Sequence, residues 1–195
     1  MRHRRKGRTL GRNPSHQRAL LRALASALFL TERDAEFDPN PPKVKGRIIT
    51  TVEKAKEVRP LVEKCITIAR KGLLAEDAAK KDGTTAERGS SEWKTWREGP
   101  KWNQWNQAIA PAVDARRRCL TLLGDKGAVK ALFASVAPRF TDRPGGYTRI
   151  VRLVKPRLGD GGTRAILEFV GVRDRVVQRS QRPSFDDAPA KAGAK

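Results

Sequence analysis

The sequence predicts a two-layer α+β domain, in which helices pack on a small mixed sheet and a basic arm precedes the first helix. Apolar residues recur at helical spacing through much of the chain. Short stretches rich in β-branched residues, near residue 50 and again toward the C-terminal end, indicate strands. The order is therefore helix, strand, two or three helices and two strands. Their expected ranges are 14–30, 47–50, 51–71, 108–123, 126–137, 147–155 and 163–170.

The first helix is predicted to begin directly after the basic arm, residues 1–14. Asn13 or Ser15 can accept hydrogen bonds from the free N–H groups of the first turn, and Pro14 is tolerated at the first helical position. Arg18 and Arg22 are four residues apart and share one face of the helix. We therefore expect one face to point to the core and another to phosphate. The apolar face contains Leu20, Leu21, Leu24, Leu28 and Phe29.

Residues 31–46 are expected to form a loop, because prolines at 39, 41 and 42 and a glycine at 46 prevent regular structure. Thr51 then opens the second helix, which Gly72 is expected to end. The alternating acidic residues of the loop lack the glycine and the bidentate carboxylate of a calcium loop. We interpret them as a solvated acidic patch; they are Glu32, Asp34, Glu36 and Asp38.

Residues 73–107 differ from the rest of the chain. They contain six basic and six acidic side chains, so that the segment is neutral, and they hold all four tryptophans. This composition predicts a separate unit. Two interpretations stay open for the aromatic residues: local packing onto the domain, or docking on RNA or on a neighbouring protein. The tryptophans are Trp93, Trp96, Trp102 and Trp105.

The last part of the fold is predicted from short signals. Gly124 ends one helix and Asp125 caps the next. The Pro-Gly-Gly sequence at 144–146 is a turn signal that leads into a strand hairpin. Residues 176–195 are polar and rich in Ala, Pro and Lys, which predicts a disordered basic tail.

The charge of the chain points to a polyanionic partner. The 195 residues include 42 Lys and Arg against 21 Asp and Glu, which gives a formal charge of +21. No acidic residue precedes Glu32. A charge pattern of this kind is typical of nucleic-acid-binding proteins. The arm has no apolar stripe for a membrane surface, and the longest apolar stretch, residues 23–30, is too short to span a bilayer. We expect a cytoplasmic protein.

Nothing in the sequence predicts catalysis, a metal or a cofactor. Cys65 and Cys119 lie in helical apolar patterns and are expected to be free buried thiols in a reducing compartment. His3 and His16 have no cysteine or carboxylate cluster beside them. An enzyme such as a nuclease would need clustered carboxylates or an acid–base pair centred on histidine. We therefore do not expect an enzyme.

Several blocks of sequence, in order, resemble the bacterial large-subunit ribosomal protein L-17 family. They are MRHRRKGRTLGR followed by SHQRALLRALASAL, then GRIITTVEKAKEVRPLVEKCITIAR, ALFASVAPRFTDRPGGYTRIVRL and AILEFVG. The resemblance covers roughly residues 1–30, 47–72 and 115–171. It implies one family domain over residues 1–175. Residues 31–46 enlarge a link that is short in the family, and the Trp-rich insertion 73–107 has no counterpart in it.

The resemblance implies a structural constituent of the large ribosomal subunit that supports translation. Its partners would be 23S rRNA and neighbouring large-subunit proteins, with one copy per ribosome. The alternative is another basic nucleic-acid binder, such as a nucleoid-associated protein or an RNA chaperone. The arm could also be a solvated tail, 116–118 a solvated face, and the residues around the Gly-Gly turn purely structural. The expected RNA contacts are Arg2, His3, Arg4, Arg5, Lys6, Arg8, Arg12, His16, Arg18, Arg22, Arg116, Arg117, Arg118, Arg139, Arg143, Tyr147 and Arg149.

Overall fold

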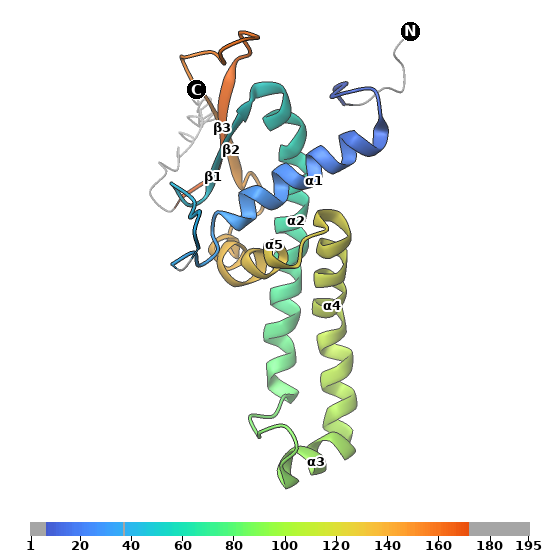
Figure 1. The fold of residues 1–195 in the computed structure, drawn as a ribbon. Coiled ribbons are helices and arrows are strands. Elements are labelled where there is room, and N and C mark those ends of the chain that lie inside the picture. The colour runs from blue at the N-terminus through green and yellow to red at the C-terminus, as the bar shows by residue number, and fades with distance from the viewer. Residues whose placement is uncertain (1–6, 37, 172–195) are drawn as a thin grey trace, which may run out of the picture.

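The computed structural model describes residues 7–36 and 38–171, which form a helical layer and a small sheet (Figure 1). This confirms the predicted α+β class. The helices and strands are α1 Pro14–Leu30, β1 Arg47–Thr51, α2 Val52–Ala79, η1 Lys80–Asp82, α3 Ser91–Glu98, α4 Pro100–Leu123, α5 Lys126–Ala131, η2 Leu132–Val136, η3 Ala137–Phe140, β2 Thr148–Arg152 and β3 Arg164–Phe169. None of the described helices is both long enough and apolar enough to cross a bilayer. The predicted tail, 176–195, lies outside the described residues.

The sheet has the strand order β1-β3-β2, with β3 in the middle. Both outer strands run antiparallel to β3, so the expectation of a mixed sheet is wrong in this detail. The antiparallel direction of β1 is also seen in the residue that precedes it. The carbonyl oxygen of Gly46 accepts a hydrogen bond of 2.9 Å from the N–H of Phe169 at the end of β3. The start of β1 therefore lies beside the end of β3.

The core lies between the inner face of the sheet and helices α1, α2 and α5. Phe29 of α1 is fully buried and stacks on Phe169 of β3 with 5.7 Å between ring centroids. Ile66 of α2 and Leu167 of β3 are also fully buried in this cluster. The inward positions of the strands and the apolar stripes of the helices thus meet in one core.

The predicted caps of two helices are confirmed. The side chain of Asn13 accepts a hydrogen bond of 2.8 Å from the N–H of Ser15, and Pro14 is the first residue of α1. Gly124 ends α4 in the left-handed conformation, with φ of 74°. The side chain of Asp125 then accepts a hydrogen bond of 2.7 Å from the N–H of Gly127 at the start of α5.

The second helix does not end at Gly72, as the sequence predicted, but continues to Ala79. Gly72 has a packing role instead, because a Cβ atom at this position would lie only 2.8 Å from the Cβ of Ala115 in α4. The missing side chain lets α2 and α4 approach closely. These two helices form a hairpin, here called the α2–α4 hairpin, that projects from the sheet and carries α3 at its far end (Figure 1).

The helix expected at 126–137 is divided into three pieces. Its α-helical part ends at Ala131, a π-helical turn covers Leu132–Val136, and a 3-10 turn covers Ala137–Phe140. Pro138 lies in the last turn and has no N–H to continue the regular ladder of hydrogen bonds. The irregular turns nevertheless keep Leu132 and Val136 fully buried.

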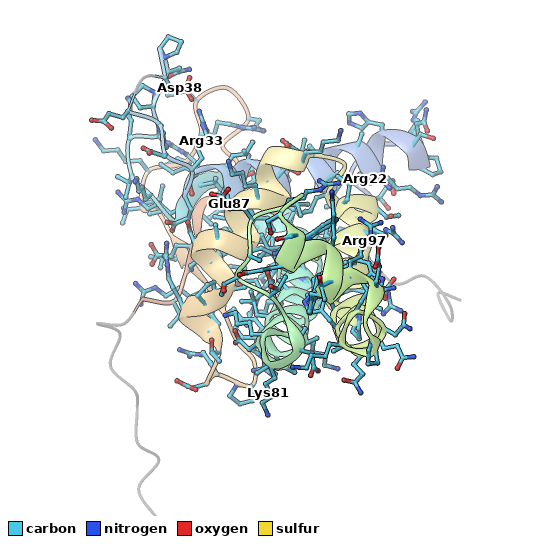
Figure 2. All side chains as sticks on the ribbon, turned by 90° about the horizontal axis from the view of Figure 1, so that it is seen from below. Arg22, Arg33, Asp38, Lys81, Glu87 and Arg97 are labelled. Atoms are coloured by element: carbon cyan, nitrogen blue, oxygen red, sulfur yellow. The ribbon has the colours of Figure 1, made fainter. Side chains whose placement is uncertain are left out.

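One ion pair ties the loop 31–46 to the body of the domain, and another lies within the loop. Glu32 has a side chain only 6% exposed and makes a bidentate pair with Arg139 of η3. Arg33 pairs with Asp38 at 2.5 Å, and Figure 2 shows these two side chains together within the loop. The interpretation of this loop as a solvated acidic patch is therefore wrong for Glu32, because the fold brings a distant arginine to it.

Candidate nucleic-acid interface

The exposed face of α1 lies next to the last turns of α4. Arg22 Nη2 donates a hydrogen bond of 3.1 Å to the carbonyl oxygen of Thr121. The hydroxyl of Thr121 donates to the carbonyl oxygen of Arg117, one turn earlier. His16 and Arg18 are exposed on the same helix as Arg22. The structure thus places Arg22 of α1 beside the turn of α4 that follows Arg117.

The three consecutive arginines of α4 point in different directions. Arg116 pairs with Glu76 of α2 at 3.0 Å, so it lies on the side of α4 that faces α2. Arg118 pairs with Asp114 at 2.8 Å, one turn earlier in its own helix. Arg117 has no ion pair with a described residue. Because consecutive helical residues are about 100° apart, this run does not form a single basic patch.

The end of the basic arm lies against α2. The backbone N–H of Arg8 donates to Glu57 Oε2 at 3.3 Å, and the side-chain amide of Gln17 donates to the carbonyl oxygen of Gly11 at 2.6 Å. Arg8 and Arg12 are both exposed. Five predicted contacts of the arm lie outside the described residues: Arg2, His3, Arg4, Arg5 and Lys6.

Three predicted arginines in the C-terminal part of the fold are tied to the protein itself. Arg139 holds the buried Glu32 of the loop. Arg149 Nε lies 2.5 Å from Glu168 of the central strand. Arg143 donates through Nε to the carbonyl oxygen of Gly145 at 3.2 Å within the turn. Their side chains still reach the surface, since those of Arg139 and Arg149 are 41% and 49% exposed.

Tyr147 is a core residue and not part of a surface. Only 1% of it is exposed, and its ring lies 5.2 Å from the ring of Phe140. The expected contact of Tyr147 with RNA is therefore corrected, because its side chain is buried in the core cluster. Its hydroxyl has no hydrogen-bond partner among the described residues.

Replacing Tyr147 with phenylalanine is expected to stabilise the fold by about 1 kcal/mol, because a buried hydroxyl without a partner is destabilising. RNA affinity should not change. Urea unfolding and a filter-binding titration with rRNA would measure the two effects. Weaker RNA binding by a variant of normal stability would show that the hydroxyl touches RNA.

A basic hollow lies where the start of α2 packs beside the edge of β2. Its volume is about 540 Å³. Lys56 and Arg59 enter it from α2, and Arg149 and Arg152 enter it from β2. Thr148 also lines it, and its hydroxyl donates a hydrogen bond of 2.9 Å to Glu63 Oε1. Four cations around an open hollow are suited to binding an anion such as phosphate.

The positive charge of this basic hollow is only partly neutralised. Arg59 pairs with Glu63 at 3.1 Å, and Arg149 pairs with the glutamate of β3 described above. Lys56 and Arg152 have no carboxylate within ion-pair distance among the described residues. Two of the four cations are therefore available to a ligand without first breaking an ion pair.

Of the cations in the basic hollow, sequence reasoning identified only Arg149. Lys56 and Arg59 are three residues apart in a helix, and this spacing was a visible sign of a shared basic face. Nothing local connects that face with Arg152, which follows much later in the chain. The packing of α2 against β2 brings them together.

The cysteines are placed as predicted. Cys65 and Cys119 are free thiols, and both are fully buried. The sulfur of Cys119 lies 3.7 Å from the carbonyl oxygen of Cys65. A hydrogen bond with the Cys119 side chain and burial in the core both raise the pKa of Cys65 well above its usual range, so this thiol is not activated as a nucleophile. Within 7–36 and 38–171, no three His, Cys, Asp or Glu side chains gather as metal ligands.

The fold and its surface define a small, strongly basic α+β protein that presents cations from a helix face and from the edge of a sheet. Residues 20–170 match the family described as Ribosomal protein L17, so the chain belongs to the L17 family of ribosomal proteins. This family supplies structural constituents of the ribosome.

Curated relatives agree with this assignment. The chain is 67% identical over 190 residues to the large ribosomal subunit protein bL17 of Rhodopirellula baltica. The aligned residues cover 97% of this chain and 90% of the relative. It is 34% identical over 182 residues to the bL17 protein of Acidobacterium capsulatum, covering 93% and 80%. With the bL17 protein of Desulfotalea psychrophila, it shares 34% identity over 177 residues, covering 91% and 95%.

Proposed function

We propose that this protein is a structural constituent of the large ribosomal subunit and that it binds 23S rRNA there. One copy is present in each particle, in the cytoplasm, beside neighbouring large-subunit proteins. Membership of the L17 family and the names of its relatives support the ribosomal part of this proposal. The RNA-binding part is carried by the basic hollow between α2 and β2.

A phosphate group of the RNA backbone is the ligand that this basic hollow suits best. Lys56 and Arg152 can neutralise phosphate charge directly, because neither side chain is already held by a carboxylate of a described residue. Folded RNA is recognised largely through its shape, its phosphates and its 2′-hydroxyl groups. A hollow that binds the phosphates of the RNA backbone rather than its bases therefore fits a structural rRNA-binding protein.

Further contacts are proposed for the basic arm and for the face where α1 meets α4. Arginine is well suited to these positions, because its fork of donors matches phosphate and its planar group stacks on bases. The arm has five arginines in its first twelve residues and no acidic residue. The proposed contacts outside the basic hollow are Arg2, His3, Arg4, Arg5, Lys6, Arg8, Arg12, His16, Arg18, Arg22, Arg117 and Arg118.

Sedimentation of cell extracts through a high-salt sucrose gradient tests this proposal. The full-length protein should remain with the 50S particles at about one copy per particle. Salt weakens the phosphate contacts, but contacts that depend on the shape of the folded RNA and contacts with neighbouring proteins remain. Quantitative mass spectrometry of the fractions would give the copy number. Recovery of the protein with the nucleoid or in the free fraction would contradict the proposal and would favour the alternative of a general nucleic-acid binder.

A further inference from the structure

The far end of the α2–α4 hairpin carries an aromatic cluster, here called the Trp tip and formed by α3 and the start of α4. The ring of Trp96 lies edge-on to Trp102, with 5.1 Å between centroids, and 5.6 Å from Trp105. Trp102 and Trp105 stack at 5.2 Å. The guanidinium of Arg97 lies 5.0 Å from the ring of Trp93 and 5.3 Å from that of Trp102.

The Trp tip packs on itself, at a distance from the sheet and from α1. Trp96 donates a hydrogen bond of 3.0 Å through Nε1 to the carbonyl oxygen of Asp82, which fixes α3 to the end of η1. Figure 1 shows α3 at the end of the hairpin opposite to the sheet, and Figure 2, seen from below, shows Arg97 and Lys81 on this end. All four tryptophans remain partly exposed. Local packing therefore explains how the cluster holds together, but it leaves the rings incompletely covered.

An open hollow adjoins the central tryptophan, and we call it the tip hollow. Its volume is about 490 Å³, and Trp96, Gly99 and Pro100 supply its apolar lining. Glu92 and Lys101, of opposite charge, also line it. A hollow with an apolar lining and charges of both signs suits a single apolar side chain presented by a polypeptide.

The charge of the segment distinguishes a protein partner from RNA. Residues 73–107 carry six basic and six acidic side chains, so the whole charge of +21 lies in the rest of the chain. A surface for a polyanion would carry an excess of cations, as the basic hollow at the other end of α2 does. Tryptophan and arginine are also enriched among the residues that dominate protein–protein interfaces.

We infer that the Trp tip is a docking site for a neighbouring protein of the large subunit. The partner presents a polypeptide segment of low net charge and inserts one apolar side chain into the tip hollow, against Trp96. This inference rests on the proposed ribosomal function. It assigns the two ends of the α2–α4 hairpin to different partners, RNA at the sheet end and protein at the Trp tip.

Site-specific photo-crosslinking in purified large subunits tests the inference. The full-length chain would carry p-benzoylphenylalanine in place of Lys101, at the tip hollow, and mass spectrometry would identify the crosslinked molecule. We expect one large-subunit protein. Thr95→Arg, which adds a long charged side chain to the lining of the tip hollow, should lower the crosslink yield by at least about tenfold.

Gln104→Arg is the matched control, because it adds the same side chain to an exposed position of the same segment that does not line the tip hollow. Its crosslink yield should equal that of the parent. Crosslinking to 23S rRNA, a protein crosslink that survives Thr95→Arg, or no crosslink in subunits that contain the chain would each overturn the inference alone. Absence of the chain from the subunits would overturn the proposed function together with it.

Discussion

Replacing Lys56 and Arg152 with glutamine is expected to weaken binding to 23S rRNA and to lower its dependence on salt. These two cations of the basic hollow have no ion pair with a described residue, so their removal leaves no carboxylate unpaired. Each lost phosphate contact reduces the slope of log K against log salt by about 0.7–0.9. The double variant should therefore lose about 1.4–1.8 from the slope. Filter-binding titrations at several salt concentrations would measure it.

The control for this experiment is the pair Lys81→Gln and Lys94→Gln in the neutral segment. Both lysines are exposed, and the change removes the same total charge from the protein. The salt slope should stay at the parent value, because this segment is not proposed to touch RNA. Equal loss from both double variants would show that the net charge of the protein, and not the basic hollow, determines RNA affinity.

Replacing Gly72 with leucine is expected to destabilise the fold by about 3 kcal/mol, because it forces a side chain into a filled interface. A Cβ atom alone would lie 2.8 Å from the Cβ of Ala115 and 3.2 Å from a ring carbon of Phe133. Helix propensity acts in the opposite direction, since leucine is better than glycine by up to about 1 kcal/mol. A net loss can therefore come only from packing. Urea unfolding followed by circular dichroism would measure it.

Ala78→Leu is the matched control for the glycine variant. Ala78 is exposed on α2, two turns closer to the Trp tip. Adding the same side chain there should change the free energy of unfolding by less than about 0.5 kcal/mol. If Gly72→Leu were as stable as this control, α2 and α4 could not be in the close contact described above.

Local signals predicted most of the element boundaries. The cap at Asn13, the stop at Gly124 and the cap at Asp125 each depend on residues within one turn, so the sequence alone contains the necessary information. The hairpin of β2 and β3 was predicted in the same way, from a turn followed by two apolar stretches. Such contacts join residues that are close in sequence, so local patterns are sufficient to predict them.

Residues whose role depends on distant partners were predicted wrongly. Glycine is a common residue at the end of a helix, and Gly72 was therefore predicted to end α2. Its role is instead to let α2 pack closely against Ala115 of α4. Glu32 was expected in water, but it is buried against Arg139. Tyr147 was expected to contact RNA because it lies beside the Gly-Gly turn, yet the core contains its ring.

For the candidate interface too, features that depend on local sequence were predicted and features that depend on tertiary packing were not. Arg18 and Arg22 of α1 share a face because of helical spacing, and this face is exposed as expected. The basic hollow was not predicted as a unit, because Lys56 and Arg152 meet only when a helix packs beside a strand from the other end of the chain. Charge composition indicates the chemistry of the partner, whereas tertiary packing decides where that partner can bind.

The position of β3 has a consequence for how the protein is made. Of the strands in 7–36 and 38–171, β3 is the last to be synthesised, yet it lies between the other two, and Thr51 of β1 is paired with Arg164 at its start. While the chain is being translated, β1 therefore has no partner, and its backbone donors and acceptors stay open to other chains. The helices of the hairpin are close in sequence and can pair earlier. The sheet can therefore close only after β3 has been synthesised.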